Sequence, residues 1–144
     1  MNKNVLLANC QTEILRLLPR FLTQLDQDPL SPTFGCFDRN FWHYRLRDFS
    51  SMVLQQNVVV LALLYTHNFA GNTLYQHSLT KDLIAGCLHF WQTQQHKNGT
   101  FDEYWPHEQG YPPLVFSTFA VLRTLQLVKL DPSPYLPALQ RAIK

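Results

Sequence analysis

Residues 52–65 read MVLQQNVVVLALLY, and this stretch decides the fold class of the chain. Its three consecutive valines, Val58–Val60, are β-branched and are also compatible with a strand. The stretch contains no glycine or proline, and it is longer than a typical strand. We therefore predict a helix over about Phe49–Thr66, buried on most of its sides because it is apolar on nearly all of them. Asp48 or Ser50 is the expected N-cap, since a short side-chain oxygen accepts the unpaired N–H groups of a first turn.

Helical spacing of apolar residues continues on both sides of this stretch. Upstream, it predicts a helix over about Val5–Leu25, which Pro19 should kink or split. Downstream, it predicts helices over about Leu74–Gln95 and Leu114–Leu130, followed by the start of another at about Tyr135–Lys144.

These helices predict an all-α fold of antiparallel helical hairpins, a partial α/α toroid, in a single helical-repeat domain over residues 1–144. The two hairpins span about 5–66 and 74–130, and the further helix starts at about 135. A ring or solenoid of helix pairs needs about three or more repeats to enclose its core. We therefore expect a missing C-terminal remainder of the toroid or a homo-oligomer. The alternative is a complete small bundle with a short last helix.

Composition narrows the classes of partner. Of the 144 residues, 46% are hydrophobic and only 15% are charged, whereas a typical soluble domain has about 25% charged residues. Part of this charge-poor surface is expected to pack against something else. The net charge is +2, and the lysines and arginines are scattered without a basic run. Because phosphate backbones are bound by clustered basic residues, we expect no nucleic-acid partner.

The chain has an odd number of widely separated cysteines and no CxxC, which favours a reducing compartment over a disulfide framework; they are Cys10, Cys36 and Cys87. The first ten residues lack the apolar core of a signal peptide. The longest apolar run, Val58–Tyr65, is far short of the ~20 residues that span a bilayer. We expect a soluble, cytoplasmic protein with no membrane association.

One loop motif occurs twice, at an offset of 64 residues, and each copy lies between the two helices of a hairpin. The two copies should therefore lie at the same end of the assembly, where repeat proteins commonly bind their ligands. A structural interpretation assigns the glycine to a positive φ, the phenylalanine to the end of the core, the aspartate to capping and the histidine to a buried carbonyl. The copies are Gly35-Cys36-Phe37-Asp38 with His43, and Gly99-Thr100-Phe101-Asp102 with His107.

The polar and aromatic residues around the motif suggest a binding site. Aromatic rings stack on the apolar faces of sugars, while acids and arginines hydrogen-bond sugar hydroxyls. Paired carboxylates can also serve as general acid and base. The candidate substrate-binding residues are Asp38, Arg39, Trp42, His43, Asp102, Glu103, Tyr104 and His107.

No familiar catalytic motif accompanies these residues. The chain lacks GxSxG, GxxxxGK[ST], GxGxxG and HExxH, so we assign no catalytic residue. A metal site that combines His43 and His107 with Asp38 or Glu108 is conceivable, but the histidines lack a tight ligand spacing. The sequence therefore predicts neither a metal nor another cofactor.

The segment Gln95–Phe101, which follows Phe90, resembles the glutamine–glycine–aromatic motif of terpene-cyclase-like α/α toroids. In that motif the glutamine ties a helix end to the next loop. Here Trp91 replaces the usual aliphatic residue and Phe101 replaces tryptophan. The longer stretch 98–119 is similar to toroid domains of polysaccharide-acting proteins, including the heparinase II/III-like lyases. The resemblance covers about residues 30–130, but the aspartate-rich cyclase motifs and the asparagine–tyrosine–histidine set of the lyases are absent.

The resemblance implies a polysaccharide- or sugar-binding or -processing α/α-toroid protein, or an N-terminal fragment of one. This hypothesis predicts that Trp42, Trp105, Asp102 and Glu103 line one cleft. The alternative is a non-catalytic helical-repeat module that binds protein, with Trp42 and Trp105 buried and an exposed apolar flank on the second or fourth helix. A third hypothesis, an isoprenoid-binding terpene-cyclase-like toroid, requires a deep apolar cavity.

Overall fold

The computed structural model describes residues 3–144. Met1 and Asn2, with which the predicted domain begins, lie outside the described residues. The described part of the chain is all-helical, as predicted, and its regular elements are helices joined by turns and loops. In chain order they are α1 (Lys3–Leu22), α2 (Arg39–Trp42), the 3-10 helix η1 (Met52–Asn57), α3 (Val58–Thr66), α4 (Ser78–Thr93), α5 (Tyr111–Val128), the 3-10 helix η2 (Ser133–Tyr135) and α6 (Leu136–Ala142).

The helix boundaries correct three details of the sequence prediction. Pro19 does not split α1, which continues through it to its end one turn later. The helix expected from Phe49 begins only at Met52, and its first part is a 3-10 helix. Neither Asp48 nor Ser50 is its N-cap: that position belongs to Ser51, which makes no side-chain capping bond. The four-residue helix α2 was not predicted, because it is too short to show a period.

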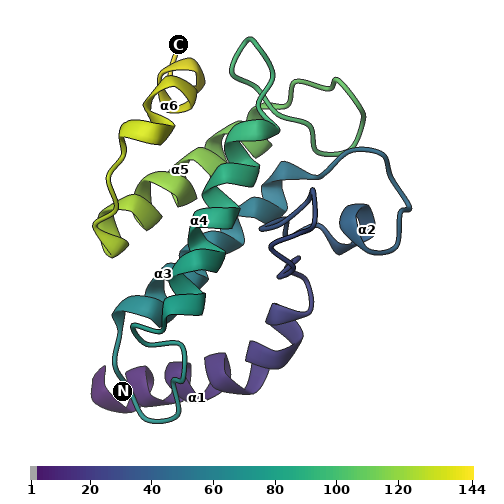
Figure 1. Cartoon of the computed structure of the whole chain (residues 1–144). Coiled ribbons are helices and arrows are strands. Elements are labelled where there is room, and N and C mark those ends of the chain that lie inside the picture. Colours follow the sequence, from purple (N-terminus) through teal and green to yellow (C-terminus); the bar gives the residue numbers. More distant parts are fainter. Residues whose placement is uncertain (1–2) are drawn as a thin grey trace.

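Helix α3 lies at the centre of the assembly, where it packs against both α4 and α5. Figure 1 shows these three helices side by side, with α1 across one end and α6 beside α5. The 3-10 helix η1, which leads into α3, also packs extensively against α5. The β-branched start of the central helix is tolerated because tertiary packing outweighs intrinsic propensity.

The core forms between η1, α3, α4 and α5. On α3 the fully buried side chains are Val58, Leu61 and Ala62, while Leu63 is 42% exposed. Two phenylalanines from the loops, Phe37 and Phe101, complete the core and are at most 1% exposed. Burying a side chain of this size stabilises a fold by about 1.5–3 kcal/mol.

The three cysteines are free thiols: Cys10 is exposed, whereas Cys36 and Cys87 are buried. Burial raises the pKa of the Cys36 thiol to about 12, and it also raises that of Cys87. Because the thiolate is the reactive form of cysteine, these two buried thiols are poor nucleophiles at neutral pH.

Helices α1 and α5 each keep several apolar side chains at the surface. Helix α1 exposes Val5, Leu6 and Leu7 among others. Helix α5 carries an apolar stripe along one side, with side chains that are 40–75% exposed. Within residues 3–144, no helix is both long enough and apolar enough to cross a membrane. The α5 stripe consists of Tyr111, Val115, Phe116, Phe119 and Leu122.

Candidate binding site at the paired motif loops

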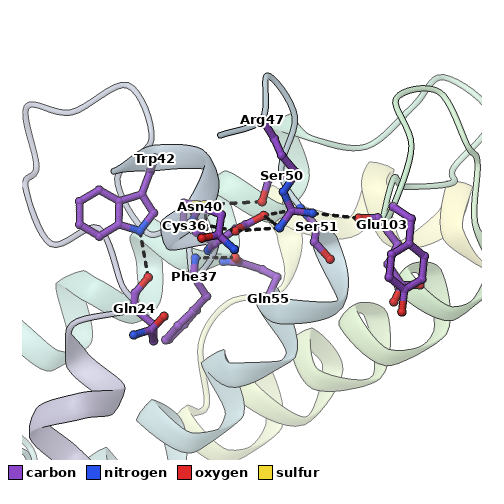
Figure 2. Close-up of polar contacts among 12 residues, drawn as sticks. Gln24, Cys36, Phe37, Asn40, Trp42, Arg47, Ser50, Ser51, Gln55 and Glu103 are labelled. Atoms are coloured by element: carbon purple, nitrogen blue, oxygen red, sulfur yellow. Dashed lines mark hydrogen bonds and ion pairs between the residues drawn. The ribbon is translucent and has the colours of Figure 1, made fainter. Parts of the chain in front are cut away.

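The two copies of the motif lie in adjacent loops, which we name the first loop (residues 35–51) and the second loop (residues 96–110). The backbone N–H of Met52, directly after the first loop, donates to the carbonyl of Asp102 in the second, at 2.9 Å. The Arg47 guanidinium donates to the carbonyl of Glu103 at 3.3 Å, a contact visible in Figure 2. These two bonds confirm that both loops lie at the same end of the helices.

Both motif glycines adopt the conformation that the structural interpretation assigned to them. Gly35 has a φ of +87° and Gly99 a φ of +92°. Each also lies against the backbone of a helix that follows in the chain. A Cβ on Gly35 would stand 2.2 Å from the backbone carbon of Gly86 in α4, and one on Gly99 would stand 2.1 Å from the carbonyl oxygen of Arg141 in α6. The motif therefore docks the first loop on α4 and the second loop on α6.

A glutamine side chain fastens each of these docking contacts. Gln55 donates to the carbonyls of Gly35 (2.8 Å) and Cys87 (3.0 Å). Gln95 donates in the same way to the carbonyls of Gly99 and Ala138, both at 3.0 Å. In each copy one amide thus joins the motif glycine to the helix on which it rests. For Gln95 this is the tie between a helix end and a loop that the glutamine motif implied.

Asp38, the first candidate residue, is only 1% exposed and organises the first loop. Its carboxylate caps α2 through the N–H of Asn40 (3.2 Å) and accepts the N–H of Ser51 (2.8 Å). It also forms an ion pair of 3.0 Å with Arg47. With its oxygens engaged in this way, Asp38 positions the loop and is not available as a free acid or base.

Three other candidates lie on or beside α2. The indole N–H of Trp42 donates to the carbonyl of Gln24 at 2.9 Å, and the ring is partly buried (Figure 2). Arg39 lies over the ring of Tyr44, 5.1 Å from its centre. His43 is exposed, and its ring packs edge-on against Trp42 and Tyr44. The assignment of this histidine to a buried carbonyl is therefore wrong.

Asp102 is the corresponding organiser of the second loop, and it is 9% exposed. It forms a 2.8 Å contact with Nε2 of His96 and accepts the N–H groups of His107 (3.0 Å) and Gln109 (3.4 Å). Burial by itself raises the pKa of a carboxyl group, but these hydrogen bonds to His96, His107 and Gln109 outweigh it, so the pKa of Asp102 is lowered.

This lowered pKa predicts how acid affects stability. A carboxylate whose folded-state pKa lies below its unfolded value of about 3.9 stabilises the fold above that pH, and the stabilisation is lost as pH falls through the folded-state pKa. We expect Asp102→Asn to lower the free energy of unfolding at pH 7, and the difference from wild type to shrink as pH falls below about 4. Urea denaturation between pH 7 and pH 2 measures this. Asp82→Asn, at an exposed site on α4, is the control; an equal difference for Asp102→Asn at every pH would contradict the prediction.

The tip of the second loop presents the remaining candidates. Tyr104 is 67% exposed and its neighbour Trp105 is 71% exposed, while Glu103 is partly buried. The Glu103 carboxylate raises the pKa of the Tyr104 hydroxyl through a hydrogen bond. The Glu108 carboxylate accepts the three consecutive N–H groups of residues 103–105 at 2.8–3.4 Å. These bonds hold the two aromatic side chains on a defined turn.

His107 is also exposed, so the buried-carbonyl assignment fails for the second histidine as well. Its φ of +62° is in the left-handed region, as is that of Gln109. The two residues adopt this conformation where their N–H groups turn toward the Asp102 carboxylate.

A pocket of about 580 Å³ opens beside the first loop. Of the four residues expected to line one cleft, it includes only Trp42. Trp105 is exposed on the neighbouring loop and Asp102 is buried, so this pocket does not bring the four residues together. The pocket is lined by Thr33, Phe41, Trp42, Arg45, Leu46, Arg47 and Asp48.

An apolar groove of about 300 Å³ lies between α1 and α3, and no residue of the two motif loops lines it. Of the pockets described, this groove most resembles the deep apolar cavity that the isoprenoid hypothesis requires. Its lining residues are Leu7, Gln11, Ile14, Val60, Leu63, Leu64, His67 and Phe69.

Sequence reasoning missed three residues that organise the loops: Arg47, Gln55 and His96. Arg47 stands nine residues after Asp38 (47 − 38), a distance at which no local pairing rule applies. Gln55 is the first of three consecutive amides, Gln55–Asn57, within an otherwise apolar stretch, and nothing in the sequence singles it out from Gln56 for its buried role. His96 lies next to Gln95, inside the stretch that carries the family resemblance, but it has no counterpart in the first copy of the motif.

Comparison with known proteins adds no identification: no protein-family model, no curated protein and no solved structure matches this chain.

Proposed function

We propose that this protein binds carbohydrate across the two motif loops, as part of a polysaccharide-processing α/α toroid. The observation that carries the proposal is a hydrogen bond between the two loops. Arg47 of the first loop lines the pocket and also donates to the carbonyl of Glu103 in the second loop. This contact places an aromatic and arginine-containing pocket next to a loop tip with exposed aromatic rings. The tie that Gln95 makes between α4, the second loop and α6 is consistent with the toroid resemblance.

The chemistry of the two loops favours saccharides over other small ligands. Pockets of 300–1,000 Å³ suit small molecules, and the volume beside the first loop falls in this range. Phe41 and Trp42 offer rings to the apolar face of a sugar, while Arg45 and Asp48 offer a donor and an acceptor for its hydroxyls. An acidic sugar would also pair with arginine, whose planar guanidinium matches a carboxylate.

The proposed role is binding, since the two motif aspartates are committed to the loops. Asp38 is paired with Arg47, and Asp102 with His96. A general acid or base must be within hydrogen-bond reach of the substrate and be free to exchange its proton. Within residues 3–144 these two carboxylates do not meet that requirement. Their buried positions instead fix the loops that present the aromatic side chains.

The test is calorimetric titration of the full chain with neutral and acidic polysaccharides, using dextran, hyaluronan, alginate and heparin as probes. We expect saturable binding to at least one, weakened about tenfold by Trp105→Ala because the exposed ring supplies about 1.4 kcal/mol of contact. Removing this exposed side chain should change stability by only about 0.5 kcal/mol or less. Absence of binding to all four, or equal binding by Trp105→Ala, would overturn the proposal.

A second candidate, a surface that binds protein, is favoured by the exposed apolar stripe on α5, although its expectation that Trp105 is buried is wrong, because that side chain is 71% exposed. Contiguous exposed apolar side chains commonly mark interaction sites, and the fourth predicted helix is one of the two on which this alternative placed its exposed flank. Phe119→Ala, at a ring that is 64% exposed on that stripe, is the matched control in the saccharide experiment. Saccharide binding that Phe119→Ala weakens as much as Trp105→Ala does would not support the loops as the site.

A further inference from the structure

The second loop brings together three side chains that are typical metal ligands. His96, Asp102 and His107 each offer one ligand atom, and these atoms all lie within 4.8 Å of one another. Nε2 of His96 is 2.8 Å from Oδ1 of Asp102, and the two imidazole rings have their centres 6.0 Å apart. Asp102 is buried, His96 is partly buried and His107 is exposed, so the cluster opens to solvent on one side.

The backbone of the loop holds this cluster in place. The N–H of His96 donates to the carbonyl of Thr100 at 2.9 Å, and Gly110 pairs with Phe101 in an isolated bridge, with an N–H to O distance of 2.8 Å. The N–H of His107 is fixed on Oδ2 of Asp102. Oδ1 of that carboxylate is thus the oxygen that faces His96, and two ligands are supplied by a preorganised loop.

The first loop provides an internal comparison. There the aligned aspartate, Asp38, is neutralised by the guanidinium of Arg47 at 3.0 Å. At the same offset of 64 residues, Arg47 aligns with Tyr111, the first residue of α5, which has no positive charge. Asp102 is instead next to two imidazoles. A bound cation would supply the charge that arginine supplies in the first copy.

We propose that His96, Asp102 and His107 bind a zinc ion. Two imidazole nitrogens and one carboxylate oxygen are a set that Zn²⁺ accepts in tetrahedral geometry, with a fourth position left for water or another ligand. Mg²⁺ and Ca²⁺ prefer sites made of oxygen atoms, so a site rich in imidazole selects against them. This site replaces the expectation of no metal, and it differs from the combination of His43, His107 and Asp38 or Glu108 considered from the sequence.

The test titrates Zn²⁺ alone into the full chain by calorimetry and follows Co²⁺, as a spectroscopic substitute, by its visible absorption. Every protein carries Cys10→Ser, because that exposed thiol could bind zinc by itself. The informative variant is His107→Gly. It removes the imidazole, keeps the N–H that Asp102 accepts, and suits the positive φ at this position. His89→Ala, at an exposed histidine on α4 outside the cluster, is the matched control.

We expect one equivalent of Zn²⁺ to bind, with affinity reduced about tenfold or more by His107→Gly and unchanged by His89→Ala. Co²⁺ should give the absorption of a tetrahedral site in the parent protein and lose it in His107→Gly. No binding by the parent, or an equal affinity in parent and His107→Gly, would overturn the proposal. Because no saccharide is present, the result is independent of the carbohydrate proposal.

Discussion

Gly35→Ala is expected to lower the free energy of unfolding by about 4 kcal/mol. The new Cβ would stand 2.2 Å from the backbone carbon of Gly86 and 2.4 Å from the backbone nitrogen of Cys87. Backbone atoms inside a helix cannot rotate away, so the first loop and α4 would have to separate. Overpacking of this kind costs about 1–3 kcal/mol or more, and the φ of +87° adds about 1–2 kcal/mol for a residue with a Cβ. Urea denaturation measures the change.

Gly71→Ala separates the two causes. Gly71 has a similar φ of +84°, but a Cβ there would meet only the end of the Leu15 side chain, at 2.8 Å. That side chain can move, so we expect a loss of about 1–2 kcal/mol from the backbone conformation alone. If Gly35→Ala fails to fold while Gly71→Ala folds, the docking contact is supported. Equal losses in the two variants would show that the contact with α4 adds nothing.

Gln55→Met is expected to destabilise the protein by about 3 kcal/mol. The substitution keeps the length of the side chain but removes its amide. The carbonyls of Gly35 and Cys87 then lose their donor, and the N–H of Phe37 loses the oxygen that it reaches at 3.3 Å. Gln55 is 1% exposed, so water cannot replace these bonds unless the structure opens. Each unsatisfied buried group costs about 1–3 kcal/mol, partly relieved by small movements.

The neighbouring Gln56→Met provides the control, because Gln56 is partly exposed. We expect it to change stability by about 0.5 kcal/mol or less. Hydrogen exchange adds a local measurement: the Phe37 amide should lose protection in Gln55→Met and keep it in Gln56→Met. A Gln55→Met variant as stable as wild type would mean that the three hydrogen bonds make no net contribution to the free energy of unfolding.

Sequence periodicity predicted the long helices. In α4 and α5 an apolar side packs against the core, whereas the described part of α1 contributes only Phe21 and Leu22, at its end. Periodicity failed where loop chemistry sets the boundary. The helix predicted from Phe49 cannot begin there, since the Asp38 carboxylate accepts the N–H of Ser51 and holds that segment in the first loop. Such a bond between residues thirteen apart leaves no periodic trace in the sequence.

For the candidate site, the sequence predicted the pairing of the loops and the structural use of glycine and phenylalanine. It could not show that both aspartates are buried, or that the pocket beside the first loop includes Trp42 but not Trp105, because these depend on how the loops fold against each other. The sequence also could not predict the cluster of His96 and His107 around Asp102. His96 joins it across a turn and His107 through a left-handed backbone, and neither follows from ligand spacing.

The hydrogen bond from Met52 to Asp102 closes the chain between residues 52 and 102. That segment holds η1, α3 and α4, so the bond is a non-local contact between residues fifty apart (102 − 52). Closing a long segment costs entropy before its contacts compensate for it, which delays non-local contacts during folding. The paired loops should consequently order late in folding, as a final cooperative step. During refolding, they should remain susceptible to protease for a longer time than α3 or α4.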